Sequence, residues 1–163
     1  MNEKNMSLDE MPILLRREVE ARILKPLIEI MEKEMGEEKT KEIVISVISK
    51  ESRQGGKHAG EFNGGNELED LQHIMRFHEE GGALEVQIYS PDEQSLMLKT
   101  IKCKYVEMYE RLGMKKWGPY LSCLRDQGFF EGLNPNFKFI RHETLMTGGS
   151  CCDSLVVDKR RKK

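Results

Sequence analysis

The residues that could do chemistry are concentrated in the last third of the chain. All four cysteines and the only tryptophan lie between Cys103 and Asp153. Cys123 and Asp126 are three residues apart in a predicted helix, so they lie about 60° apart on one face. A thiolate can attack an electrophilic carbon, and a carboxylate can take or deliver the proton. The pair is therefore a candidate catalytic couple, and a packed structural cysteine beside a surface aspartate is the alternative.

Two neighbouring segments could add groups to this couple. Cys103 and Glu107 are four residues apart on the preceding predicted helix, so they share a face. Cys151 and Cys152 are adjacent on a predicted strand, so their side chains point to opposite sides and only one of them can face an interior site.

The sequence predicts no metal site and no cofactor. A Cys₄ zinc site needs two close cysteine pairs, commonly CxxC, and the chain has no such pair. His142 could act as a base, and a hydrogen-bonded histidine in a sheet is the alternative.

Periodicity and turn residues predict an α+β fold that positions these groups. We expect N-terminal helices over 1–54, a glycine-rich loop at 55–66, an α+β core over 67–158 and a solvated basic tail at 159–163. The order of helices, hairpin, helices and hairpin favours an antiparallel sheet of about four strands packed against helices. A chain of 163 residues suits a single domain, 1–163.

Composition limits the partners. Charged residues make up 33% of the chain with a formal net charge of −2, so we expect no binding to nucleic acid or to an anionic membrane. No apolar run approaches the length of a membrane span, and the polar N-terminus does not resemble a signal peptide. We therefore expect a cytoplasmic protein with free thiols and a small-molecule ligand or substrate, and a homodimer is compatible with the sequence.

Three blocks in the last third resemble the L-2-amino-thiazoline-4-carboxylic acid hydrolase family. The blocks are CKYVEMYERLG, LSCLRD and ETLMTGGSCCD, in this order and with matching spacing. An upstream RRxxEARxxxP element, beginning at Arg16, is also compatible with the family. Ser154 stands where the family usually has an aromatic residue. The resemblance therefore does not determine the pocket wall at this point, nor the substrate. The matching positions are Cys103, Tyr105, Tyr109, Leu112, Gly113, Cys123, Asp126, Thr144, Leu145, Met146, Gly148, Cys152 and Asp153.

The resemblance implies hydrolysis of a cyclic, non-peptide C–N bond, in which a 2-aminothiazoline ring opens to N-carbamoyl-cysteine. A thiolate of Cys123 or Cys152 would add to the amidine-like carbon, or Asp126 or Glu107 would orient a water molecule. The tetrahedral intermediate would then expel the ring nitrogen. The predicted catalytic residues are Glu107, Cys123, Asp126 and Cys152. The predicted substrate-binding residues are Cys103, Tyr105, Asn134, His142, Thr144 and Asp153.

A second hypothesis comes from the end of the chain, where an extended segment, a glycine turn and a strand-borne cysteine are also similar to 4-vinyl reductase-type domains. This resemblance implies a non-catalytic ligand sensor or carrier with a pocket between sheet and helices. A third interpretation makes the cysteines and aspartates structural. Convergence of the predicted catalytic residues on one pocket would favour the enzyme.

Overall fold

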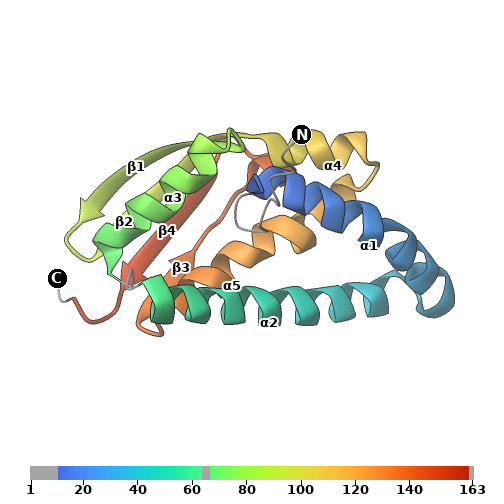
Figure 1. Ribbon diagram of the computed structural model, residues 1–163, viewed down its shortest axis with the longest axis horizontal. Coiled ribbons are helices and arrows are strands. Elements are labelled where there is room, and N and C mark those ends of the chain that lie inside the picture. Colours follow the sequence, from blue (N-terminus) through green and yellow to red (C-terminus); the bar gives the residue numbers. More distant parts are fainter. Residues whose placement is uncertain (1–10, 64–66, 162–163) are drawn as a thin grey trace, which may run out of the picture.

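The computed structural model describes residues 11–63 and 67–161, and it has an α+β fold in which the four strands form one sheet (Figure 1). The order across the sheet is β1-β2-β4-β3, and every neighbouring pair is antiparallel. The predicted fold class is therefore confirmed. The strands are β1 (Leu84–Asp92), β2 (Ser95–Cys103), β3 (Phe137–Ile140) and β4 (Cys152–Asp158).

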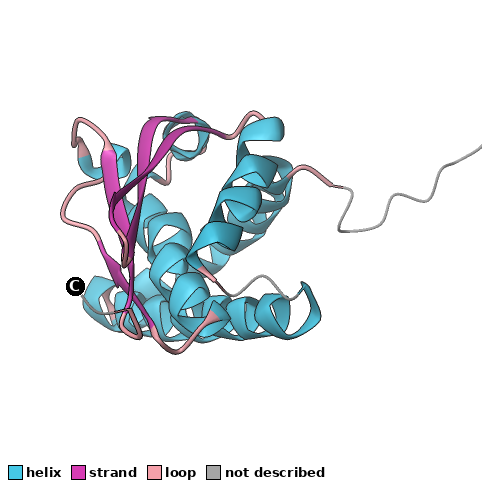
Figure 2. Ribbon diagram, turned by 90° about the vertical axis from the view of Figure 1, so that its left-hand side faces the viewer, coloured by secondary structure: helices cyan, strands magenta, loops and turns pink. Residues whose placement is uncertain are grey.

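One face of the sheet is covered by helices (Figure 2). Along β4, alternate residues from Cys152 to Asp158 are buried, as the two-residue period of a strand requires. The helices α3 (Leu71–Glu80) and α5 (Leu124–Leu133) pack on this face, where Val156 shares one hydrophobic cluster with side chains of both.

The N-terminal helices lie next to this layer. Helix α1 (Ile13–Met35) is followed by α2 (Glu37–Asn63), and α4 (Lys104–Arg111) continues from the end of β2. The buried side of α1 packs Ala21 and Ile28 into a second hydrophobic cluster, which also contains side chains of α2 and α4. These contacts hold α1 against the body of the protein.

The predicted glycine-rich loop is wrong for residues 55–63, which continue α2, and residues 64–66 lie outside the described residues. The reason is close helix packing. A Cβ atom added to Gly56 would collide with the backbone carbonyl oxygen of Phe129, and one added to Gly60 would lie 2.6 Å from the carbonyl oxygen of Leu133.

Helix α5 has a matching pair of glycines on its side of the contact. A Cβ atom at Gly128 would collide with Ser52, and one at Gly132 would collide with the carbonyl oxygen of Arg53. Glycines spaced four residues apart on both helices therefore let the two backbones approach closely. The glycines of the predicted loop are therefore part of a helix-packing contact.

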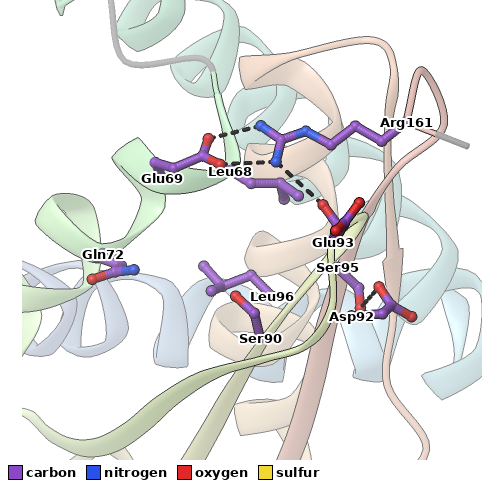
Figure 3. A pocket seen from close by; sticks show the side chains of 9 residues that line it. All are labelled: Leu68, Glu69, Gln72, Ser90, Asp92, Glu93, Ser95, Leu96 and Arg161. Atoms are coloured by element: carbon purple, nitrogen blue, oxygen red, sulfur yellow. Dashed lines mark hydrogen bonds and ion pairs between the residues drawn. The ribbon is translucent and has the colours of Figure 1, made fainter. Parts of the chain in front are cut away.

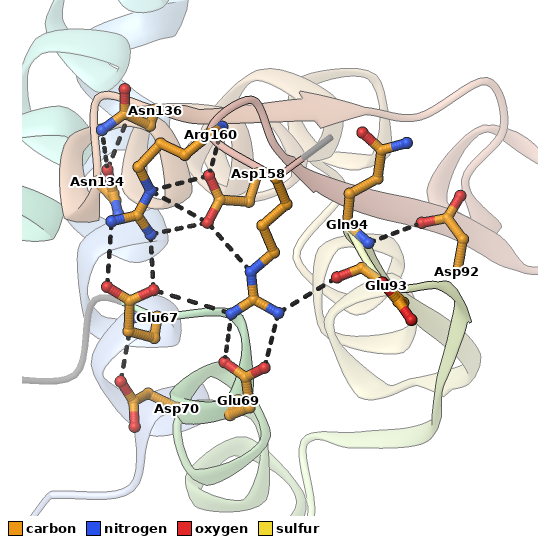
Figure 4. Close-up of polar contacts among 11 residues, drawn as sticks. Glu67, Glu69, Asp70, Asp92, Glu93, Gln94, Asn134, Asn136, Asp158 and Arg160 are labelled. Carbon is orange, nitrogen blue, oxygen red and sulfur yellow. Dashed lines mark hydrogen bonds and ion pairs between the residues drawn. The ribbon is translucent and has the colours of Figure 1, made fainter. Parts of the chain in front are cut away.

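The basic tail is also not simply solvated. Arg161 donates hydrogen bonds to the carboxylate of Glu69 and to the carbonyl oxygen of Glu93 (Figure 3). Arg160 binds the carboxylates of Glu67 and the fully buried Asp158 (Figure 4). These ion pairs connect the chain after β4 to the segment that leads into α3. They also compensate the charge of Asp158, since a buried carboxylate needs such partners. Residues 162–163 lie outside the described part.

Candidate functional site

A cavity of about 330 Å³ lies where β2 ends and β4 begins, between the sheet, α5 and the first turns of α1. Its sheet side is formed by the small inward-facing side chains of Thr100, Cys152 and Ser154. Small residues leave volume that larger ones would fill. The size is within the range of small-molecule sites.

Three thiols from different elements line this cavity. Cys103 is the last residue of β2, Cys152 is the first residue of β4, and Cys123 ends a π-helical turn, Pro119–Cys123, that leads into α5. The hydroxyl group of Ser122, in this turn, lies 3.0 Å from that of Tyr109 in α4, so the two groups connect the turn to α4. Single π-helical turns of this kind often occur at functional sites.

Burial keeps these thiols protonated. It raises the pKa of Cys103 to about 11 and, together with the nearby charge of Asp126, raises the pKa of Cys123 to about 12. The pKa of Cys152 is also raised by burial. A nucleophilic or metal-binding cysteine needs the opposite shift, because the thiolate is the reactive form. In this resting arrangement the thiols are therefore neutral side chains at neutral pH.

The charged centre of the cavity is an ion pair between Asp126 and Arg141. One guanidinium nitrogen of Arg141 donates to Asp126 Oδ2 at 2.5 Å, and the other donates to the carbonyl oxygen of Cys123 at 2.6 Å. The guanidinium also lies 5.1 Å from the ring centre of Phe139. The Arg141 side chain is 13% exposed and that of Asp126 is 47% exposed, so water can reach the carboxylate.

A second charged group lies at the α1 side. Arg17 and Arg125 line the cavity, and the carboxylate of Glu20 joins them at 2.5 and 3.0 Å. Burial, together with the charge of Arg17, lowers the pKa of Arg125. Two guanidinium groups thus share one carboxylate at the wall of a cavity, which is an arrangement suited to an additional anion.

None of these three arginines was among the predicted site residues. Arg17 lies in the upstream element of the family resemblance, which was a usable signal. Arg141 directly follows β3, and only the tertiary structure brings it to Asp126, fifteen residues earlier in the chain. Arg125 adjoins Asp126 in sequence and lines the same cavity.

The predicted catalytic residues separate into two groups. Cys123, Asp126 and Cys152 line the same cavity, so the structure brings three of the four together. Glu107 is exposed on α4 and does not line the cavity. The prediction placed Cys103 and Glu107 on one face of a helix because they are four residues apart. In the structure, Cys103 is the last residue of β2, precedes α4 and points inward.

The predicted substrate-binding residues separate in the same way. Cys103 and Tyr105 line the cavity, and burial raises the pKa of Tyr105. Asn134 is buried between α5 and β3, where its side-chain oxygen accepts the N–H of Asn136. Asn134 therefore shapes a turn rather than the cavity wall.

The remaining three predicted residues stabilise the connection between β3 and β4. Asp153 accepts hydrogen bonds from the backbone N–H groups of His142 and Glu143 and lies 3.1 Å from the His142 ring. The hydroxyl of Thr144 accepts the N–H of Thr147, as a cap of a short 3₁₀ turn. None of the three lines the cavity.

A second hollow, of about 610 Å³, lies between the start of α3 and the β1–β2 turn (Figure 3). It is open to solvent, it is crossed by the Arg161–Glu69 ion pair, and no predicted site residue lines it. Among the residues that the structure describes, no group of His, Cys, Asp and Glu side chains is placed to hold a metal ion. The cavity with the three thiols is therefore the candidate site.

Comparison with known proteins agrees with the sequence motifs. The profile of the L-2-amino-thiazoline-4-carboxylic acid hydrolase family matches residues 16–155. The chain belongs to this family. The match covers Arg17 of α1 and the cavity-lining residues of α5 and β4 as well as the three motif blocks. No curated protein sequence matches the chain at a significant level.

Solved structures show where the fold recurs. The phenol-responsive sensory domain of the transcription activator PoxR, crystallised with phenol, is similar with a TM-score of 0.55 and 12% identity. The similarity covers 93% of this chain and 78% of that domain, so the two share a fold. In the described ranges of this family member, no helix is both long and apolar enough to cross a membrane.

Proposed function

We propose that the protein hydrolyses a small cyclic amidine that carries a carboxylate, such as a 2-aminothiazoline carboxylate, in the cavity between β4 and α5. The observation that most directly supports this proposal is the Asp126–Arg141 ion pair at the cavity. Three of the four predicted catalytic residues line the same cavity. Membership of the hydrolase family supports this reaction class.

The proposed chemistry is direct attack by water. Asp126 accepts a proton from a water molecule as its oxygen adds to the amidine carbon of the ring, and Arg141 orients the carboxylate. The half-exposed position of Asp126 gives water access to it. The protonated thiols form neutral parts of the wall in this scheme, because their raised pKa values oppose a thiolate nucleophile.

The expected expulsion of the ring nitrogen does not fit the named product. N-carbamoyl-cysteine keeps the ring nitrogen bonded to both of its carbons, so the bond that breaks to form it is the bond between the amidine carbon and sulfur. Sulfur leaves with a proton as the free thiol, and the attacking water supplies the carbonyl oxygen. Expulsion of the ring nitrogen would give an S-carbamoyl product instead.

The substrate carboxylate would bind near Arg17 and Arg125. Both guanidinium groups line the cavity, and the carboxylate of Glu20 joins them, so the two positive charges can bind a further carboxylate oxygen. This placement would put the anionic group toward α1 and leave the ring near Asp126.

The test is ring opening of 2-aminothiazoline-4-carboxylate, followed by product analysis for a free thiol. Asp126→Asn should lower kcat by about 10²-fold or more, as removal of a general base does. Glu107→Gln is the matched control, because this carboxylate is exposed outside the cavity and its loss should leave kcat unchanged. Cys123→Ser and Cys152→Ser should each retain most of the turnover. A loss in either cysteine variant equal to that of Asp126→Asn would favour the covalent route.

The second candidate is a ligand sensor without turnover. The likeness to a phenol-responsive sensory domain favours it, as do the apolar side chains of Met75, Phe129 and Phe130 at the cavity. Calorimetry with phenol and with the thiazoline, beside the turnover assay, separates the two functions. Tight binding of phenol with no turnover of the thiazoline would support the sensor and contradict the hydrolase.

A further inference from the structure

Helix α1 carries an apolar stripe on its solvent side. The side chains of this stripe have exposed fractions from 46% to 68%, which places them with the most exposed large apolar groups of the described residues. Their spacing of three or four residues places them within about 120° on one side of the helix. The opposite side holds Ala21 and Ile28, which are buried in the protein. The stripe consists of Leu15, Val19, Ile23, Leu27 and Ile30.

The size of the stripe is unusual for a surface left in water. From the exposed fractions, the five side chains expose roughly 500 Å² of mostly apolar surface, which is at the upper end for a monomer. A specific interface needs about 800 Å² from each partner. The stripe and the charged residues along its edges together approach this area, so the helix can form the centre of a stable dimer.

We propose that the stripe binds the same helix of a second copy of this chain, in antiparallel orientation, with the two-fold axis close to Ile23. This register places Val19 opposite Leu27 of the other copy and Leu15 opposite Ile30. Ile23, which is 68% exposed, then meets its own counterpart at the centre. Every residue of the stripe thereby gains an apolar partner.

Charges along the edges favour the antiparallel arrangement. Arg16 and Glu34 lie near one edge of the stripe. Arg22, which is 57% exposed and already paired with Glu18, and Glu29 lie near the other edge. In both cases the cation is nearer the N-terminus and the anion nearer the C-terminus. Antiparallel pairing brings Arg16 toward Glu34 and Arg22 toward Glu29, whereas parallel pairing would align like charges. Lys33 falls opposite Ile13, at the end of the overlap.

Residues 1–10 are a weaker candidate for covering the stripe. Their sequence, MNEKNMSLDE, contains only three apolar side chains, too few to match the stripe. A second copy supplies five apolar side chains at matching spacing. The dimer would also support the cavity, because α1 contributes Ile13 and Arg17 to its wall. The inference does not depend on the proposed reaction.

Sedimentation equilibrium tests the oligomeric state of the full chain. We expect a dimer for the wild type and at least a tenfold weaker dimer for Ile23→Glu, whose side chain is exposed in the monomer and should not disturb folding. Tyr89→Glu on β1 is the matched control, because Tyr89 is 49% exposed away from α1, and this variant should stay dimeric. A monomeric wild type, or a dimer that Ile23→Glu leaves intact, would overturn the proposal.

Disulfide cross-linking tests the register. Oxidised Ile23→Cys should form a covalent dimer, since the two copies of this position meet at the axis. Leu15→Cys and Ile30→Cys should not cross-link alone but should do so when mixed. The wild type reports any background from its four native cysteines. Efficient self-cross-linking at all three positions would show parallel helices and reject the antiparallel dimer.

Discussion

The two ends of strand β4 present the same alternating face to very different surroundings. Cys152 and Ser154 line a cavity, whereas Val156 is fully buried in a dense cluster with Leu96 and Phe139. At that filled end the rings of Phe139 and Phe130 stack with centres 5.7 Å apart.

The difference shows that strand period and side-chain size have separate effects. The period of two decides which residues point inward, and it is the same along all of β4. Size decides whether the inward space is filled. Small side chains on β2 and β4 leave a hollow at one end, and leucine, valine and phenylalanine fill the other end.

Two adjacent glycines of α2 provide the strongest test of this contrast. Gly56 faces the backbone of α5, while Gly55 lines the cavity and a Cβ atom there would meet nothing within 4 Å. Gly56→Ala should lower the free energy of unfolding by about 3 kcal/mol, because a backbone carbonyl cannot move aside easily. Gly55→Ala should raise it by about 0.5 kcal/mol through helix propensity.

Urea denaturation of both variants measures this difference. The chemical change is identical and the positions are adjacent in one helix, so propensity cancels between them. Equal effects on stability would contradict the close approach of α2 and α5.

A second, smaller contrast lies within β4 itself. Val156→Ala removes two methyl groups from the filled end and should cost about 2 kcal/mol of unfolding free energy. Ser154→Ala keeps the volume at the cavity end and should change stability by less than about 0.5 kcal/mol. Thermal unfolding followed by circular dichroism measures both, and a larger loss for Ser154→Ala would reverse the assignment of filled and hollow ends.

Local patterns predicted the fold class well. Alternation in the segment around Val86 and helical spacing in α4 are short-range signals, and both elements form where expected. The glycines from Gly55 to Gly60 misled the prediction because their sequence is typical of a loop. Only the position of α5, more than sixty residues later, explains them.

The candidate site was predictable where its residues lie in the three motif blocks. Cys123 and Asp126 were predicted together because they are three residues apart, and the π-helical turn that ends at Cys123 runs directly into α5. The position of Arg141 depends on how β3 packs beside α5, which no spacing rule provides. His142 and Asp153 looked functional by residue type, but they bond each other and the backbone at the edge of the sheet.

The smallest expected effect is on the pH dependence of stability, and it has opposite signs at the two ends of β4. At the cavity end, burial raises the pKa of Cys123 to about 12, above the unfolded value of about 8.5. Its contribution to the free energy of unfolding is therefore complete below about pH 8.5 and is lost as the pH rises, by about 1 kcal/mol near pH 9. At the filled end, the ion pair with Arg160 lowers the pKa of Asp158, so its contribution is present above about pH 4 and is lost in acid.

Chemical denaturation at several pH values separates the two ends. Cys123→Ala should reduce the alkaline slope and leave the acid slope unchanged, and Tyr105, whose pKa is also raised, should account for part of the alkaline slope that remains. Asp158→Asn should reduce only the acid slope. If Cys123→Ala changed the acid slope as well, the cavity and the ion-paired end would be coupled, and the separation of the two ends would fail.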